Sequence, residues 1–196
     1  MINKKQPIRI AIAGLGFGET VHIPASFYNE NIELVGLWHP RLDRLKQACS
    51  KHNLYAYETW KDLLNDPKIE GIIIATPPAP RYELALEAIK SGKHLLLEKP
   101  TCLNSEEVID LQRKALQRNL KIAVDYEYRA VPLFMQAKRL IIEKKLYEPY
   151  LVKLDWLMSS RANPNRPWNW YSDEDSGGGV LGALGTHAFD MIHWLI

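Results

Sequence analysis

A short apolar run that leads straight into clustered glycines constrains the fold of this chain most. Ile8–Ala13 reads IRIAIA, and Gly14-Leu15-Gly16-Phe17-Gly18 follows at once. A short, largely apolar run of this kind is typical of strands in parallel sheets, where both faces are buried. Glycines at its end permit a tight turn and a close approach of the backbone to a ligand. We therefore expect a strand-turn-helix unit at the start of the fold.

Strand and helix patterns alternate from this turn to residue 124. Pro80–Ser91 shows how the helices are bounded, because a proline lies in its first turn and Gly92 follows its last. Strict alternation with short connections predicts an α/β fold, a doubly wound parallel sheet with helices on both faces. The other expected strands are Ile32–Leu37, Ile69–Ala75, Lys93–Leu97 and Leu120–Val124, and the other helices are Leu42–His52, Glu58–Asn65 and Asn104–Arg118.

The pattern changes after Asp125, where we place a domain boundary. Residues 1–125 form the first predicted domain, and residues 126–196 begin a second one. In the second we expect a helix at Pro132–Lys145, an alternating strand at Tyr150–Met158 and a helix that runs to Ile196. Because the chain stops inside an apolar helix pattern without a cap, we expect this domain to be truncated.

Composition excludes several classes of function. The net charge is only +2 and no run of Lys and Arg exceeds two residues, so nucleic acid and membranes are not expected partners. No apolar stretch is long enough for a signal peptide or a membrane span, which predicts a cytoplasmic protein. Cys49 and Cys102 lack a CxxC spacing, so neither a disulfide nor a zinc site is expected.

The glycine loop matches the needs of a dinucleotide pyrophosphate, which requires a tight turn, a residue without a side chain and a helix N-terminus. Gly14 and Gly16 take the first two positions of GxGxxG, but Glu19 stands at the third and Gly18 comes one residue early. A glycine turn without a ligand is the alternative. The preceding buried strand favours the nucleotide. The predicted contacts are Gly14, Leu15, Gly16, Phe17 and Gly18.

The end of the second strand indicates which dinucleotide is bound. An acidic residue there would bind the ribose hydroxyls of NAD, whereas Leu37–Arg41 contains no carboxylate. His39 and Arg41 can approach a 2′-phosphate instead, so NADP is slightly preferred over NAD. The alternative is that Arg41 only begins the next helix on its solvent face.

Two further motifs end strands at the carboxyl edge, where doubly wound sheets bind ligands. Thr76 and Pro77 are predicted to face the nucleotide, although a turn without ligand contact is the alternative. Glu98 and Lys99 follow the next strand and are also predicted to contact the cofactor. There Lys99 can exchange a proton beside the nicotinamide.

These motifs, followed by Gly177–Leu181 and Gly185–Asp190, together resemble the glucose-fructose oxidoreductase and inositol dehydrogenase (Gfo/Idh/MocA) family. The resemblance implies a Rossmann domain followed by an α+β domain with an open, mostly antiparallel sheet. It also implies hydride transfer between NAD(P) and a hydroxyl or carbonyl of a sugar, polyol or related molecule. A homo-oligomer is implied for the full-length protein.

The same resemblance implies roles for particular residues. Lys99 is the expected catalytic lysine, His187 a second acid/base or substrate contact, and Arg129 a residue that lines the substrate cleft. Ala183 stands where many members have an aspartate, which leaves a nucleotide-binding regulatory protein without catalysis as the alternative function. No metal is expected, although His187, Asp190 and His193 share a helix face.

Overall fold

The computed structural model describes residues 6–145, 150–159, 163–165 and 167–196. The chain divides into two compact units, Met1–Asp125 and Tyr126–Ile196. Among the described residues, no helix is both long and apolar enough to span a lipid bilayer.

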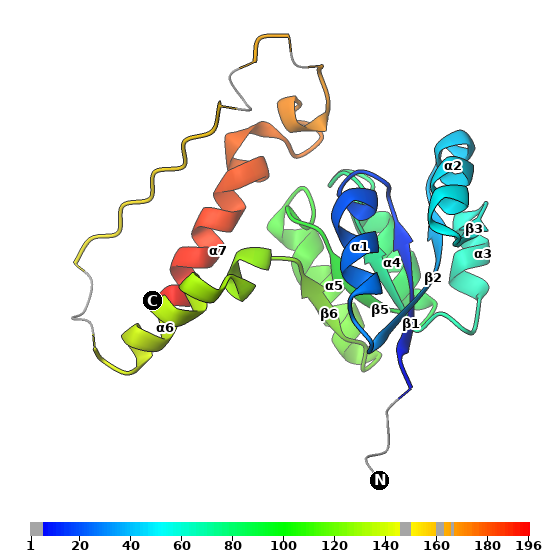
Figure 1. The fold of residues 1–196 in the computed structure, drawn as a ribbon, viewed down its shortest axis with the longest axis horizontal. Coiled ribbons are helices and arrows are strands. Elements are labelled where there is room, and N and C mark those ends of the chain that lie inside the picture. The colour runs from blue at the N-terminus through cyan, green and yellow to red at the C-terminus, as the bar shows by residue number, and fades with distance from the viewer. Residues whose placement is uncertain (1–5, 146–149, 160–162, 166) are drawn as a thin grey trace. The chain divides into compact units, whose positions relative to one another are not determined.

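The first unit is built on a six-stranded parallel sheet with the order β3-β2-β1-β4-β5-β6 (Figure 1). The chain order reverses between β1 and β4, which pair in parallel, and such a switch point opens a crevice at the carboxyl ends of the strands. The predicted parallel sheet is thus confirmed, while the three-residue edge strand β3 was not predicted. The strands are β1 (Ile8–Ala13), β2 (Ile32–Trp38), β3 (Tyr55–Tyr57), β4 (Gly71–Ile74), β5 (His94–Leu97) and β6 (Ile122–Val124).

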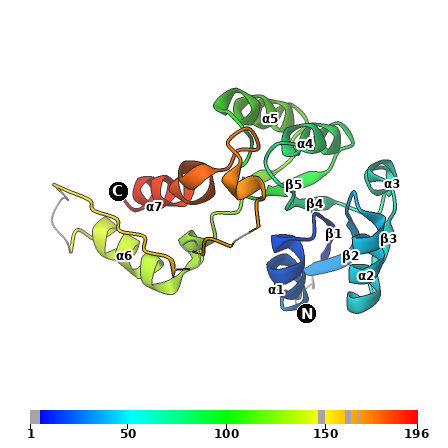
Figure 2. The same ribbon diagram turned by 90° about the horizontal axis from the view of Figure 1, so that it is seen from above.

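Helices cover both faces of this sheet, as Figure 2 shows. On one face, α1 (Ile23–Phe27) and α2 (Leu42–His52) enclose a core that includes Ile12, Leu37 and Leu45. On the other face, α3 (Trp60–Asn65), α4 (Arg81–Lys90) and α5 (Ser105–Gln117) enclose a core that includes Ile72, Leu97 and Leu111. Because successive side chains of a strand point to opposite faces, the fully apolar strands supply both cores.

Local signals explain where several helices begin and end. Thr59 Oγ1 accepts the amide of Asp62 at the start of α3, and Asn104 Oδ1 accepts the amide of Glu107 at the start of α5. Both residues are N-caps of the kind that satisfy free amides in the first turn. Asn53 ends α2 with a φ of 54°, the left-handed conformation common after a helix.

The described part of the second unit contains helices and irregular segments. A 3₁₀ turn η2 (Glu127–Ala130) leads into α6 (Pro132–Ile142), and a π-helical turn η5 (Leu181–Gly185) leads into α7 (Thr186–Leu195). Lys138 joins α6 to α7, since its ammonium donates to the Trp194 carbonyl and lies 4.5 Å from the centroid of that ring.

The strand predicted at Tyr150–Met158 was wrong. This segment is irregular, and Tyr150, Leu151 and Leu157 are highly exposed. A strand requires a hydrogen-bonded neighbour, and the alternating pattern alone does not supply one. The described residues of this unit contain no sheet.

Candidate active site

The turn after β1 requires its first glycine. Gly14 has a φ of 101°, and a Cβ placed on it would lie 2.7 Å from the carbonyl carbon and oxygen of Ala75. Any side chain would therefore be strained and would push the loop after β4 away. Gly16 differs, because a Cβ there would meet no atom within 4 Å. The absence of a side chain at Gly16 thus leaves open space beside the backbone.

The third glycine of the loop, Gly18, is closely packed, and it stands one residue before the usual third position of GxGxxG. A Cβ on Gly18 would come within 3.1 Å of Ile12 Cγ2 and 3.4 Å of the Ala75 Cβ. Glu19 is directed toward α2 instead, where its carboxylate lies 2.9 Å from Lys51 Nζ and 3.4 Å from His52 Nε2. The hydrogen bond from Lys51 lowers the pKa of Glu19. The departure from GxGxxG therefore keeps a close helix-strand contact at a shifted position.

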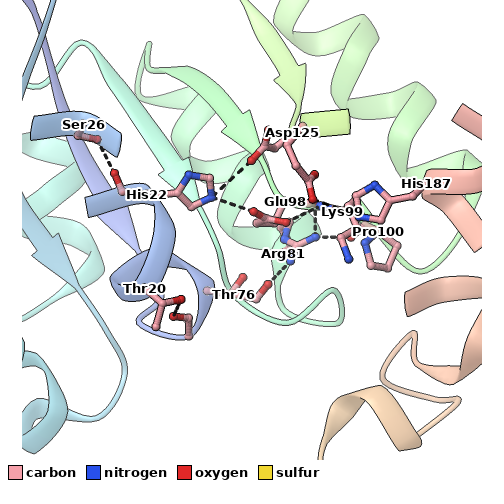
Figure 3. A network of polar contacts seen from close by, with 12 residues as sticks. Thr20, His22, Ser26, Thr76, Arg81, Glu98, Lys99, Pro100, Asp125 and His187 are labelled. Atoms are coloured by element: carbon pink, nitrogen blue, oxygen red, sulfur yellow. Dashed lines mark hydrogen bonds and ion pairs between the residues drawn. The ribbon is translucent and has the colours of Figure 1, made fainter. Parts of the chain in front are cut away.

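His22 is a buried polar residue close to the glycine loop, and it was not among the predicted site residues. It ends the π-helical turn η1 (Gly18–His22), and the ring edge of Phe17 packs against it at 5.5 Å between centroids. His22 Nε2 lies 2.8 Å from Glu98 Oε1 and 3.8 Å from Asp125 Oδ2, as Figure 3 shows. The helix that follows the glycine loop is thus tied to the ends of β5 and β6.

The three side chains form one buried electrostatic cluster. Burial raises the pKa of Asp125, and the negative charge of Glu98 raises it further, while His22 and Lys99 act in the opposite direction. One ligand atom from each of these three side chains lies within 4.8 Å of the others, a spacing that metal ligands also have. The hydrogen bond between His22 and Glu98 explains their closeness without an ion.

The loop after β4 carries the predicted pair Thr76 and Pro77. Pro77 is exposed, whereas the Thr76 side chain is buried and its Oγ1 has no hydrogen-bond partner among the described residues. A buried hydroxyl without a partner costs about 1–3 kcal/mol, so it is suited to bind a ligand. Because the backbone of Thr76 touches the space beside Gly14, the two sequence motifs meet at the same edge of the sheet.

Glu98, Lys99 and Pro100 follow β5 and are held by Arg81, the first residue of α4. The Arg81 guanidinium is buried and donates to the carbonyls of Thr76, Glu98 and Pro100 (Figure 3). One side chain therefore joins the loops after β4 and β5. Lys99 is half-buried, and its amide donates to Glu98 Oε2 at 3.2 Å.

The end of β2 brings one further arginine to the glycine loop. His39 Nδ1 accepts the amide of Arg41 at 3.0 Å, and burial is the main cause that lowers the pKa of His39. The Arg41 guanidinium is paired with Asp43 at 2.7 Å, on the solvent side. Arg44, which the sequence analysis did not select, donates from Nη2 to the Leu15 carbonyl at 3.4 Å. Its spacing of one helical turn from Arg41 was the available signal.

In the second unit, His187 is almost completely buried and Arg129 is exposed. Both Nε and Nη2 of Arg129 donate to the carboxylate of Asp190, one turn beyond His187 on α7. Both oxygens of the Asp190 carboxylate therefore accept hydrogen bonds from Arg129. Ala183 stands four residues before His187, where many members of the family that the sequence resembles have an aspartate, and its side chain is buried.

Two family descriptions match the chain, one for each unit. Residues 8–126 match an oxidoreductase family with an NAD-binding Rossmann fold, and residues 134–196 match the GFO/IDH/MocA C-terminal domain. The chain belongs to the Gfo/Idh/MocA family of oxidoreductases.

Curated proteins similar to this chain include other Gfo/Idh/MocA-type oxidoreductases. An uncharacterised oxidoreductase of Synechocystis is 42% identical over 99% of this chain and 53% of its own length. Levoglucosan dehydrogenase of Pseudarthrobacter phenanthrenivorans is 31% identical over 70% of this chain and 35% of its own. An NADP⁺-dependent scyllo-inositol 2-dehydrogenase of Bacillus subtilis is 28% identical over 96% and 51%. The chain thus spans about half the length of these relatives, or less.

Solved structures show the same fold. An NAD-binding oxidoreductase from Klebsiella pneumoniae has a TM-score of 0.82 with 26% identity, over 96% of this chain and 53% of that one. Levoglucosan dehydrogenase in complex with NADH and levoglucosan also has a TM-score of 0.82, with 24% identity over 97% and 54%.

Proposed function

We propose that this chain is the nucleotide-binding part, with the beginning of the substrate domain, of an NAD(P)-dependent oxidoreductase that acts on a sugar or polyol. The observation that carries the proposal is the open space at Gly16, in the turn after β1, together with the buried hydroxyl of Thr76, which has no hydrogen-bond partner among the described residues and lies on the loop that packs against Gly14. A pyrophosphate needs close access to the backbone, and a cofactor ribose or phosphate can satisfy the hydroxyl. The residues present therefore fit a dinucleotide.

The proposed cofactor is NADP in preference to NAD. The residues that follow β2 determine the preference between NAD and NADP. Here Arg41 and Arg44 supply two guanidinium groups, and His39 supplies an imidazole. Arg44 is the stronger candidate for a 2′-phosphate, because Asp43 neutralises Arg41 while Arg44 reaches the Leu15 carbonyl. Guanidinium groups bind phosphates with two parallel hydrogen bonds.

The proposed chemistry divides between the cofactor and the protein. A bound nicotinamide dinucleotide would accept or supply the hydride. Lys99 holds or moves the proton on the substrate oxygen, and His187 is the second acid/base group. Arg129 is the proposed substrate-binding residue, and Asp190 orients its guanidinium. The substrate class rests on the relatives that act on levoglucosan and scyllo-inositol.

A nucleotide-binding regulator without catalysis is the second candidate, because Ala183 offers no carboxylate. Glu19, the other departure from the family pattern, does not favour that candidate, because Gly18 provides the close packing. The proposed oligomer is a homo-oligomer of the full-length protein.

Titration with NADPH and NADH, followed by nicotinamide fluorescence, tests the proposal. We expect saturable binding that Gly16→Ala weakens at least about tenfold without loss of folding, because its Cβ enters open space. Lys99→Ala should keep nucleotide binding but lose turnover with a panel of sugars and polyols. Absence of binding by the parent protein would refute the cofactor assignment, and binding without turnover on any substrate would favour the regulator.

A further inference from the structure

His187 lies within an aromatic shell in the second unit. Its side chain is only 3% exposed, and the rings of Tyr126, Tyr128 and Trp156 lie 5.9, 4.8 and 6.1 Å from it between centroids. The two tyrosines meet it edge-on, which fixes the plane of the imidazole. An apolar shell of this kind disfavours a positive charge on the ring unless a carboxylate compensates it.

Glu127 brings a carboxylate to this ring. Its Oε1 lies 3.7 Å from His187 Nε2, and its side chain is 40% exposed. Glu127 stands between Tyr126 and Tyr128, and because both neighbours pack on the imidazole, the backbone that carries Glu127 is held against His187. The separation of 3.7 Å is longer than a hydrogen bond, so the attraction between the two groups is electrostatic.

The other charged groups around this ring have partners of their own. Asp190, one turn along α7, pairs with Arg129. On the segment that carries Trp156, Lys153 and Asp155 pair with each other at 3.1 Å. The phenols of Tyr126 and Tyr128 have raised pKa values, mainly because they are buried, and the charge of Glu127 also raises that of Tyr128.

The turn of helix before His187 supplies no carboxylate. The residue four positions earlier is Ala183, whose methyl group is buried. On a helix, positions four apart lie on the same face, so an acidic residue there would have faced the histidine. The acidic group beside the ring instead comes from η2, which precedes α6.

We propose that Glu127 is the positioning residue of His187, and that its carboxylate orients the imidazole and stabilises the imidazolium formed when Nε2 accepts the proton of a substrate hydroxyl. The inference rests on the proposed function. In that step the substrate O–H bond breaks and its proton passes to Nε2. A hydride leaves the carbon that bears this oxygen for the oxidised nicotinamide, so a carbonyl forms. Glu127 acts through His187.

The first test follows the His187 imidazole by NMR as the pH is varied, with His187→Gln used to assign its signal. In Glu127→Gln we expect the titration midpoint to fall by at least about 0.7 pH unit, because a unit charge about 4 Å away contributes about 1 kcal/mol even in water. Glu127→Asp should restore part of the shift. Glu143→Gln, which removes an exposed carboxylate paired with Lys145 just after the end of α6, should leave the midpoint unchanged. Equal midpoints in Glu127→Gln and the parent would overturn the proposal.

The second test uses turnover. Glu127→Gln should lower kcat at least about tenfold, leave the KM for the dinucleotide unchanged, and move the acidic limb of the pH–rate profile in the same direction as the NMR midpoint. An unchanged kcat would overturn the role of Glu127. The NMR comparison needs no turnover. An inactive parent protein would therefore count against the proposed function alone.

Discussion

His22 Nε2 and Glu98 Oε1 lie 2.8 Å apart, although 76 positions separate the two residues in the chain. Both side chains are buried. The contact joins the helix after the glycine loop to the segment that carries Lys99, so the positions of these two segments are coupled.

Replacing His22 with Ala should destabilise the first unit by at least about 2 kcal/mol, because it leaves a buried carboxylate without its donor. His22→Gln can still donate to Glu98 and should recover part of that loss. Urea unfolding measures the free energy of unfolding of both variants. His52→Ala is the matched control, since it removes a partly exposed contact with Glu19 and should cost less than about 1 kcal/mol. Equal losses in the two alanine variants would contradict the structural role of His22.

Asp125 should make stability depend on pH with an unusual sign. Its pKa is raised in the folded state by burial and by Glu98. The folded protein therefore keeps the proton on Asp125 at pH values where the unfolded chain has lost it. This contribution to the free energy of unfolding is complete below the unfolded pKa near 3.8, and it is lost as the pH rises through the folded pKa. Asp125→Asn should flatten this slope in urea unfolding measured from pH 4 upward. A steeper slope in the variant would show that the sign is wrong.

Arg81→Met should destabilise the protein by roughly 3 kcal/mol or more, because it leaves buried carbonyls of two loops without their donor. It should also weaken nucleotide binding, since the loop of Thr76 loses its tie to the loop of Glu98. Arg118→Ala removes an exposed arginine that donates to the Lys90 carbonyl, and it serves as the control in thermal unfolding. Comparable melting temperatures for both variants would refute the role of Arg81.

Arg44→Ala should weaken NADPH binding about 10- to 100-fold, the range of a charge-assisted hydrogen bond, with a smaller effect on NADH. Arg41→Ala should change either affinity less, because Asp43 already pairs with that guanidinium. Fluorescence titration of both variants with both nucleotides is the measurement. A larger loss in Arg41→Ala would return the assignment to Arg41.

The sequence predicted the sheet because largely apolar runs that alternate with helix patterns carry a strong signal, whereas the edge strand at Tyr55–Tyr57 is too short to show a period. The alternating pattern at Tyr150–Met158 was misleading because strand pairing depends on a neighbour elsewhere in the chain. Lys99 and Thr76 could be selected because they end strands. Arg81 and Asp125 could not, because their partners are backbone carbonyls and side chains that only tertiary folding brings near.

The close contact of Gly18 with Ile12 and Ala75 has a practical consequence for protein engineering. A search for three glycines at the usual spacing would pass over this chain, since the crowded position is one residue early. Libraries that diversify the loop can vary position 19 at the cost of its ion pairs with Lys51 and His52 on α2. Position 18 should stay glycine in every member.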